Sequence, residues 1–125
     1  MFPEVSRTCV KNGAQFLSHL SYENWYGSSC ASAQIFTNIA LRAIENNVWV
    51  VRCVESGISG IVNNKGEIIH PTKLFEEISF ATTIYVEKDK KLTFYTKYGN
   101  WFIWFLLVII ILNIIFRKKN DNANK

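Results

Sequence analysis

Residues 32–54, SAQIFTNIALRAIENNVWVVRCV, decide the fold that this sequence predicts. Their first part repeats apolar residues every three or four positions, which is typical of a helix with one buried face. The residues of this face are Ile35, Phe36, Ile39, Ala40 and Ala43. Asn46-Asn47 ends the pattern, and Val48–Val54 is β-branched and aromatic, as strands are. We therefore expect a helix over 32–46 followed directly by a strand.

The flanking sequence predicts further elements of both kinds. We expect a helix at Pro3–Lys11, strands at Ala14–Leu20 and Phe80–Val86, and a hairpin formed by Ile58–Val62 and Glu67–His70 around the turn Asn63–Gly66. The order is helix, strand, helix and then several strands. That order predicts a layered α/β fold, although four or five strands are few for a complete layered domain.

A long apolar run near the C-terminus predicts a membrane span. Trp101–Phe116 reads WFIWFLLVIIILNIIF, in which Asn113 is the only polar residue. With Tyr98, Gly99 and Asn100 included, the run gives roughly 28 Å of helix, close to a hydrocarbon core of about 30 Å. We therefore expect a transmembrane helix at 98–116 and a basic tail at 117–125. By the positive-inside rule, that tail would be cytoplasmic.

Composition excludes several classes of protein. The chain has 125 residues, 49% hydrophobic and 19% charged, which excludes a disordered chain. The net charge of +4 is mostly carried by the tail, so no nucleic-acid partner is expected. The three cysteines, Cys9, Cys30 and Cys53, fit no zinc spacing, and the two histidines, His19 and His70, stand alone. We expect neither a metal nor another cofactor.

An ordered set of short motifs extends from Phe2 to about Phe116. These motifs are Phe2-Pro3-Glu4, Asn12–Leu17 (NGAQFL), Ser21–Gly27 (SYENWYG), Arg42–Asn46 (RAIEN), Ser56–Ser59 (SGIS), Lys65–Ile68 (KGEI), and Tyr95, Gly99 and Trp101. Together they resemble the C-terminal part of the apolipoprotein N-acyltransferases, which belong to the nitrilase, or carbon-nitrogen hydrolase, superfamily. The resemblance implies that residues 1–97 are the C-terminal portion of a nitrilase-like α-β-β-α sandwich.

The resemblance also implies an activity. Enzymes of this family lie in the bacterial inner membrane with a periplasmic catalytic domain. They transfer an acyl chain from a phospholipid to the free α-amino group of a lipoprotein diacylglyceryl-cysteine. A cysteine thiolate is acylated, a glutamate acts as general base, and a lysine stabilises the oxyanion.

The same comparison of motifs places the catalytic triad outside this chain. In the family, the nucleophile lies in a Cys-Tyr-Glu run a few residues before the Phe-Pro-Glu motif, which here occupies positions 2–4. The glutamate and the lysine lie further upstream still. None of the three cysteines of this chain takes the place of the nucleophile. We therefore expect no catalytic residue in the chain and no activity of the chain alone. A missing N-terminal half is one candidate partner.

Five residues are candidates for a substrate loop by the same resemblance: Glu23, Trp25, Tyr26, Glu55 and Ser56. Trp25 and Tyr26 would hold the acyl chain or the lipoprotein, and the alternative for both is a hydrophobic plug on the domain. Glu23 stands where the family usually has Asp, and Glu55 replaces a usually neutral residue. His19, on a predicted strand, is expected to be a structural histidine.

Two interpretations of the whole chain follow. The first is a fragment of an apolipoprotein N-acyltransferase. The second is a non-enzymatic, single-span membrane protein that uses a remnant nitrilase scaffold for binding. The predicted span and the absent nucleophile argue against a soluble nitrilase-type amidase.

Overall fold

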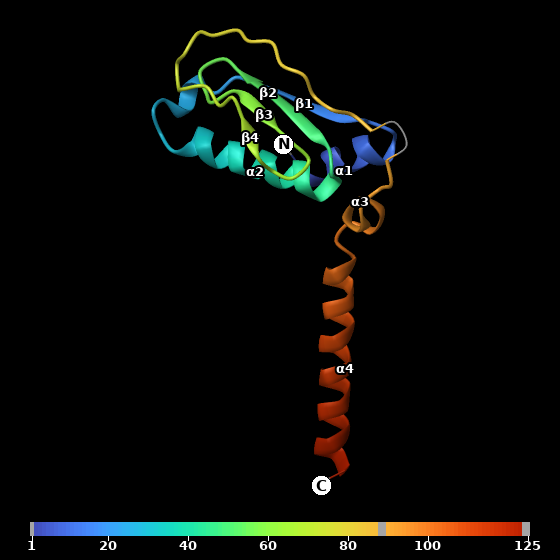
Figure 1. Ribbon diagram of the computed structural model, residues 1–125. Coiled ribbons are helices and arrows are strands. Elements are labelled where there is room, and N and C mark those ends of the chain that lie inside the picture. The colour runs from blue at the N-terminus through green and yellow to red at the C-terminus, as the bar shows by residue number, and fades with distance from the viewer. Residues whose placement is uncertain (1, 88–89, 124–125) are drawn as a thin grey trace.

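The fold is a four-stranded sheet with helices against one face (Figure 1). The structure, a computed structural model, describes residues 2–87 and 90–123, with the side chains of the last helix described as far as Ile115. The strand order is β1-β2-β3-β4, and the sheet is mixed, because β1 and β2 are parallel while the other neighbours are antiparallel. The predicted mixed α/β composition agrees with this architecture.

A strand–helix–strand unit forms the centre of the fold. β1 (Phe16–Ser21) leads through the short helix η1 (Asn24–Tyr26) into α2 (Ala31–Asn46), and β2 (Trp49–Val54) follows. Asn47 ends α2 in the left-handed conformation, with φ of 52°, and its N–H donates to the carbonyls of Ala43 and Ile44. The helix and the strand predicted in this stretch therefore form within one residue of the expected bounds.

A hairpin completes the sheet. β3 (Gly60–Val62) pairs with β2 on one side and with β4 (Ile68–Ile69) on the other. In the turn between β3 and β4, the Asn63 Oδ1 accepts hydrogen bonds of 2.9 Å from the N–H groups of Lys65 and Glu67. The side chain of an asparagine thus closes the turn, as expected for this residue type. The predicted hairpin is confirmed, with shorter strands.

The core lies between the sheet and two helices. α1 (Pro3–Lys11) and α2 pack on the same face of the sheet, and α1 begins and ends where the sequence predicts. Side chains of β2 alternate, so that Val50, Arg52 and Val54 point into this core while Val51 and Cys53 lie on the opposite face. The buried hydrophobic cluster consists of Val10, Leu17, Phe36, Ile39, Ala43, Val48, Val50 and Val62.

The opposite face of the sheet is crossed by an extended segment, residues 76–85 (Figure 1). The strand predicted at Phe80–Val86 is wrong, because the structure has no ladder in this segment. The segment crosses over β2 instead of lying beside an edge strand, so its backbone has no neighbouring strand to pair with. High β-propensity without an available partner leaves an extended chain and not a strand.

Two helices follow, and they correct the predicted membrane span. α3 (Phe94–Tyr98) ends at Gly99, whose φ is 60°, and α4 (Trp101–Ala123) begins two residues later. The predicted transmembrane helix at 98–116 is wrong: in the described part of the chain, no helix combines the length and the apolar character needed to cross a membrane. The side chains of the predicted basic tail, 117–125, lie outside the described residues.

Candidate functional site

The candidate site lies where the two parallel strands end. β1 ends at Ser21 and β2 at Val54, and the N–H of Glu55 donates to the Ser21 carbonyl over 3.3 Å. The carboxyl ends of parallel strands lie at one edge of a sheet, and the loops that follow them meet there. At this edge the loop 22–30 meets the turn 55–59. Four of the five predicted substrate-loop residues lie in these two segments with exposed or half-buried side chains.

The loop after β1 carries a cluster of three aromatic side chains. Tyr22 and Trp25 contact each other edge to face with ring centroids 5.2 Å apart, and Trp25 and Tyr26 do so at 5.9 Å. Trp25 is 69% exposed and Tyr26 is 39% exposed. Large aromatic side chains held at a protein surface offer apolar area at low entropic cost, because they have few rotatable bonds.

Glu23 lies in the same loop, but its side chain points into the interior. Its Oε1 accepts a 2.6 Å hydrogen bond from Arg52 Nη2, and the two side chains are 1% and 0% exposed. Its Oε2 accepts a 2.8 Å hydrogen bond from the Ser32 hydroxyl at the start of α2. Both carboxylate oxygens are therefore bonded, as the burial of a charge requires.

Arg52 and Ser32 extend this network to the turn after β2. Arg52 Nε donates to the Ile58 carbonyl over 2.8 Å, and the Ile58 N–H donates to the Ser32 hydroxyl, also over 2.8 Å. The Arg52 guanidinium also lies 5.6 Å from the centroid of the Phe36 ring. Gly57 sits against the network so closely that a Cβ there would meet Glu23, Ser32 and Val54. The backbone of the turn is thus fixed to the carboxylate of the aromatic loop.

His19 lies beside the guanidinium, on the core side of β1. Arg52 Nη1 and His19 Nδ1 are 3.2 Å apart, so the neutral imidazole accepts from the guanidinium. Burial, together with the nearby positive charge of Arg52, lowers the pKa of His19 below its usual 6.5. His19 is therefore held neutral as part of the packing, as the sequence suggested.

The turn residues Glu55 and Ser56 form the outer part of the site. The Glu55 side chain is exposed, and Ser56 is half-buried, with its carbonyl accepting a 3.2 Å hydrogen bond from the Phe75 N–H. The structure therefore brings Glu55 and Ser56 to the same edge as Trp25 and Tyr26, and places Glu23 beneath them.

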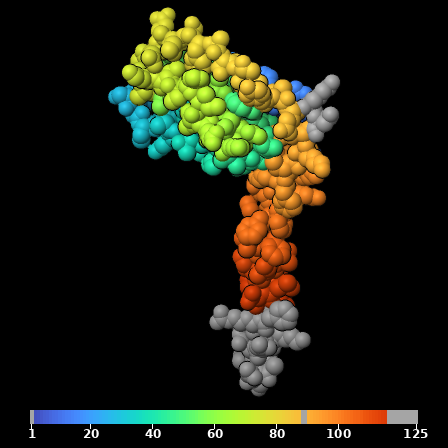
Figure 2. Space-filling view, in the orientation of Figure 1, coloured from blue at the N-terminus to red at the C-terminus, as the bar shows by residue number. Residues whose placement is uncertain are grey.

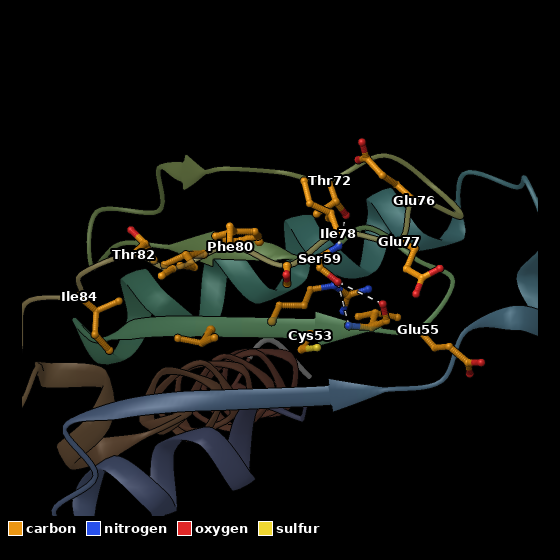
Figure 3. Close-up of a pocket in the computed structure, with 17 residues that line it drawn as sticks. Cys53, Glu55, Ser59, Thr72, Glu76, Glu77, Ile78, Phe80, Thr82 and Ile84 are labelled. Atoms are coloured by element: carbon orange, nitrogen blue, oxygen red, sulfur yellow. Dashed lines mark hydrogen bonds between the residues drawn. The ribbon is translucent and has the colours of Figure 1, made fainter.

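A cavity of about 650 Å³ opens beside this edge, between the outer face of the sheet and the segment 76–84 (Figure 3). This volume falls in the range of about 300–1,000 Å³ that is common for small-molecule sites. Glu55 and Glu77 lie at one end of the cavity and Thr82 and Ile84 at the other (Figure 3). Its apolar lining includes Val51, Ile61, Ile78, Phe80 and Ile84, and its polar lining includes Cys53, Ser59 and Thr72.

The three cysteines are separate from one another and exposed as free thiols. Cys30 Sγ is 3.7 Å from Gln34 Nε2, a neutral donor, and Cys53 lines the cavity. Among the residues described, no group of three His, Cys, Asp or Glu side chains is placed to hold a metal ion.

Sequence reasoning missed Arg52 and Ser32 as parts of the site. The sequence does contain one indication of this role: a single arginine lies within the apolar strand Trp49–Val54, and a buried arginine must be paired with an acceptor. Its partner Glu23, 29 positions away, was singled out by the family motif, but nothing in the sequence pairs the two residues.

Comparison with known proteins assigns the family. The carbon-nitrogen hydrolase family model matches residues 1–93. An apolipoprotein N-acyltransferase of Geobacter metallireducens is 31% identical over 122 residues, which are 96% of this chain and 23% of that protein. Its counterpart from Thermotoga maritima is 27% identical over 124 residues, 99% of this chain and 24% of that protein. Apolipoprotein N-acyltransferase 2 of Treponema denticola is 35% identical over 118 residues, 94% of this chain and 22% of that protein.

The chain thus spans less than a quarter of the length of these relatives. The comparisons confirm the family resemblance seen in the motifs. Because the family model covers most of its residues, the chain belongs to the carbon-nitrogen hydrolase family.

Proposed function

We propose that the chain acts as part of an apolipoprotein N-acyltransferase, which transfers an acyl chain from a phospholipid to the α-amino group of a lipoprotein diacylglyceryl-cysteine. The names of the relatives support this activity. The structural observation that supports it best is the exposed aromatic cluster Tyr22, Trp25 and Tyr26 at the carboxyl edge of the sheet, the edge at which Glu55 lines a cavity. Such a surface suits a hydrocarbon chain.

In this proposal, the chain contributes substrate contacts and not the reacting groups. The cysteine that carries the acyl group, the glutamate base and the oxyanion lysine belong to residues outside these 125. Cys30 has a neutral amide as its hydrogen-bond partner, and a thiol needs a nearby base or positive charge to become a good nucleophile. We therefore propose that the chain alone does not transfer acyl groups.

The five candidate residues take three different roles in the proposal. Trp25 and Tyr26 contact the acyl chain, because they are apolar and exposed. Glu55 and Ser56, on the neighbouring turn, face the polar part of the lipoprotein, whose free amino group is attracted by a carboxylate. Glu23 is buried and acts on the substrate only through the loop that it holds.

The proposed substrates also give the place of the reaction. Both the phospholipid donor and the lipidated acceptor reside in a membrane, so the site must reach a membrane surface. We place it at the periplasmic side of the bacterial inner membrane, as the family resemblance implies.

Photolabelling with a phospholipid tests the substrate contact. The 125-residue chain is mixed with phosphatidylethanolamine vesicles in which the lipid carries a diazirine in one acyl chain, irradiated and digested with trypsin. We expect label on the peptide 12–42, which contains Trp25. The double substitution Trp25→Ala/Tyr26→Ala should reduce that label about fivefold, because an aromatic contact is worth about 1 kcal/mol.

Leu41→Ala is the matched control. Leu41 is 45% exposed, lies in the same tryptic peptide and sits on α2, away from the aromatic loop. Its replacement should leave the label on the peptide unchanged. Equal loss of label in both variants, or no label on this peptide in the unsubstituted chain, would contradict the proposed role of the loop.

A further inference from the structure

The two segments that form the outer site are held together by one carboxylate. Glu23 belongs to the aromatic loop, Ser32 to the first turn of α2, and Arg52 to β2. Through Ser32 and Arg52, the Glu23 carboxylate is linked to both backbone polar groups of Ile58, its N–H and its C=O. Each of these four hydrogen bonds is between 2.6 and 2.8 Å long.

We infer that Glu23 is a positioning residue that fixes the aromatic loop, residues 22–30, against the turn 55–59. The aromatic side chains of the loop thereby keep a fixed position relative to the polar side chains of the turn. The inference deepens the proposed function, and its meaning for substrate binding rests on that proposal. The geometric claim itself concerns only this chain.

Burial explains why a carboxylate suits this task. Two donors, Arg52 Nη2 and the Ser32 hydroxyl, converge on the Glu23 carboxylate in the interior, and charge-assisted hydrogen bonds are about twice as strong as neutral ones. A neutral side chain at position 23 would leave the Arg52 guanidinium, whose side chain is 0% exposed, without its counter-charge. Loop and turn would then separate to admit water.

The Glu23–Arg52 pair can be compared with an apolar pair of the same size. A buried ion pair can often be replaced by apolar residues of similar volume without loss of stability. A pair of apolar side chains would fill the space beneath the loop, but it would have no group to bind Ser32 or the Ile58 carbonyl. Stability and positioning can therefore be separated by experiment.

The test uses the double substitution Glu23→Leu/Arg52→Met in the full 125-residue chain. We expect the thermal midpoint to stay close to that of the unsubstituted chain. Amide hydrogen exchange in 22–30 and 55–59 should become about tenfold faster, because local opening of these segments no longer requires the hydrogen bonds of Glu23 and Arg52 to be broken. Exchange in α1 and in the core part of α2 should not change. The emission of Trp25, taken as the difference from the matching Trp25→Phe protein, should shift to the red.

Ser32→Ala provides a second variant that leaves the Glu23–Arg52 pair in place. It removes only the hydroxyl that joins Glu23 to the Ile58 N–H, and it should speed exchange in both segments to a smaller degree. Thr37→Ala is its control, because that hydroxyl is exposed on the same helix and bonds only to the Ala33 carbonyl of its own helix. The control should exchange like the unsubstituted chain.

The inference is overturned if the double variant folds and both segments keep their original exchange rates and Trp25 emission. If the double variant does not fold, Ser32→Ala decides: unchanged exchange in both segments, or a uniform increase throughout the chain, overturns the inference. These measurements contain no lipid. The two segments could exchange faster in the variants while peptide 12–42 of the unsubstituted chain takes up no photolabel. That combination would refute the proposed function and leave the positioning role intact.

Discussion

Glu23 and Arg52, 29 positions apart in the chain, form an ion pair of 2.6 Å with both side chains almost completely buried. This pair joins the loop that follows β1 to the middle of β2. It lies directly beneath the exposed aromatic loop. Figure 2 shows the packed domain, from which α4 projects. Breaking the pair from one side should therefore affect both the stability of the fold and the order of the site.

The single substitution Arg52→Met should be severely destabilising. It leaves the Glu23 carboxylate buried without its partner, and such losses cost about 3–5 kcal/mol. The free energy of unfolding in urea measures the effect. Glu4→Gln is the comparison, because Glu4 forms its ion pair with Arg7 at the surface, where such pairs contribute about 1 kcal/mol or less. Similar losses in the two variants would contradict the buried role of Arg52.

Gly57→Ala should destabilise the chain by crowding. A Cβ at this position would lie 2.6 Å from Ser32 Oγ and 2.9 Å from Val54 Cγ1, so the overpacking should cost about 1–3 kcal/mol. Gly13→Ala separates crowding from backbone strain, since Gly13 has φ of 99° and no atom within 4 Å of such a Cβ. We expect faster exchange at Ile58 in Gly57→Ala alone. Its absence would show that the turn does not press on Glu23 as described.

Stability should depend on pH through His19. Its pKa in the folded chain lies below the 6.5 of an unfolded histidine, because burial and Arg52 disfavour its protonation. The unfolded chain therefore binds more protons as the pH falls through 6.5, and the folded state loses stability from there down to the folded pKa. Urea unfolding should show this loss between roughly pH 8 and pH 5, an interval that brackets the ordinary pKa of histidine. His19→Gln should remove that component, and an unchanged slope in this variant would refute the assignment.

The attachment of α3 should depend on one buried hydroxyl. Thr96 is 0% exposed, and its hydroxyl donates to Asn46 Oδ1 over 3.0 Å. Thr96→Val keeps the shape and leaves the amide oxygen unpaired, at a cost of about 1–3 kcal/mol. Limited proteolysis should then cut more rapidly between 86 and 100, while Thr37→Val, on the exposed side of α2, should behave like the unsubstituted chain. Equal cleavage of the two variants would contradict the role of Thr96.

Local patterns predicted the elements that depend on local interactions. The apolar repeat around Ile39 gives α2, and the turn residues around Asn63 give the hairpin, because capping and turn bonds form between near neighbours. Phe80–Val86 failed for the opposite reason. Its residues favour a strand, but a strand also needs a partner, and the fold directs this segment across the face of the sheet. The span predicted at 98–116 is wrong, and within that range Gly99, with φ of 60°, separates α3 from α4.

The site was predictable only in part for a similar reason. Motifs identified the segments around Trp25 and Ser56, and strand direction brings both segments to one edge. What no local pattern shows is that Glu23, beside exposed aromatic residues, turns inward to meet Arg52. That contact depends on the register of two strands and the placement of α2, which are properties of the folded chain.

Acyl transfer by a chimera tests the central proposal most directly. In the chimera, these residues replace the matching 23% of the Geobacter metallireducens relative. The assay follows, by mass spectrometry, the addition of an acyl chain from phosphatidylethanolamine to a diacylglyceryl-cysteine lipopeptide. We predict that the chimera acylates the lipopeptide and that Trp25→Ala weakens this activity, while the 125-residue chain alone transfers nothing. A folded chimera that binds the lipopeptide but transfers no acyl chain, or acyl transfer by the chain alone, would contradict the account.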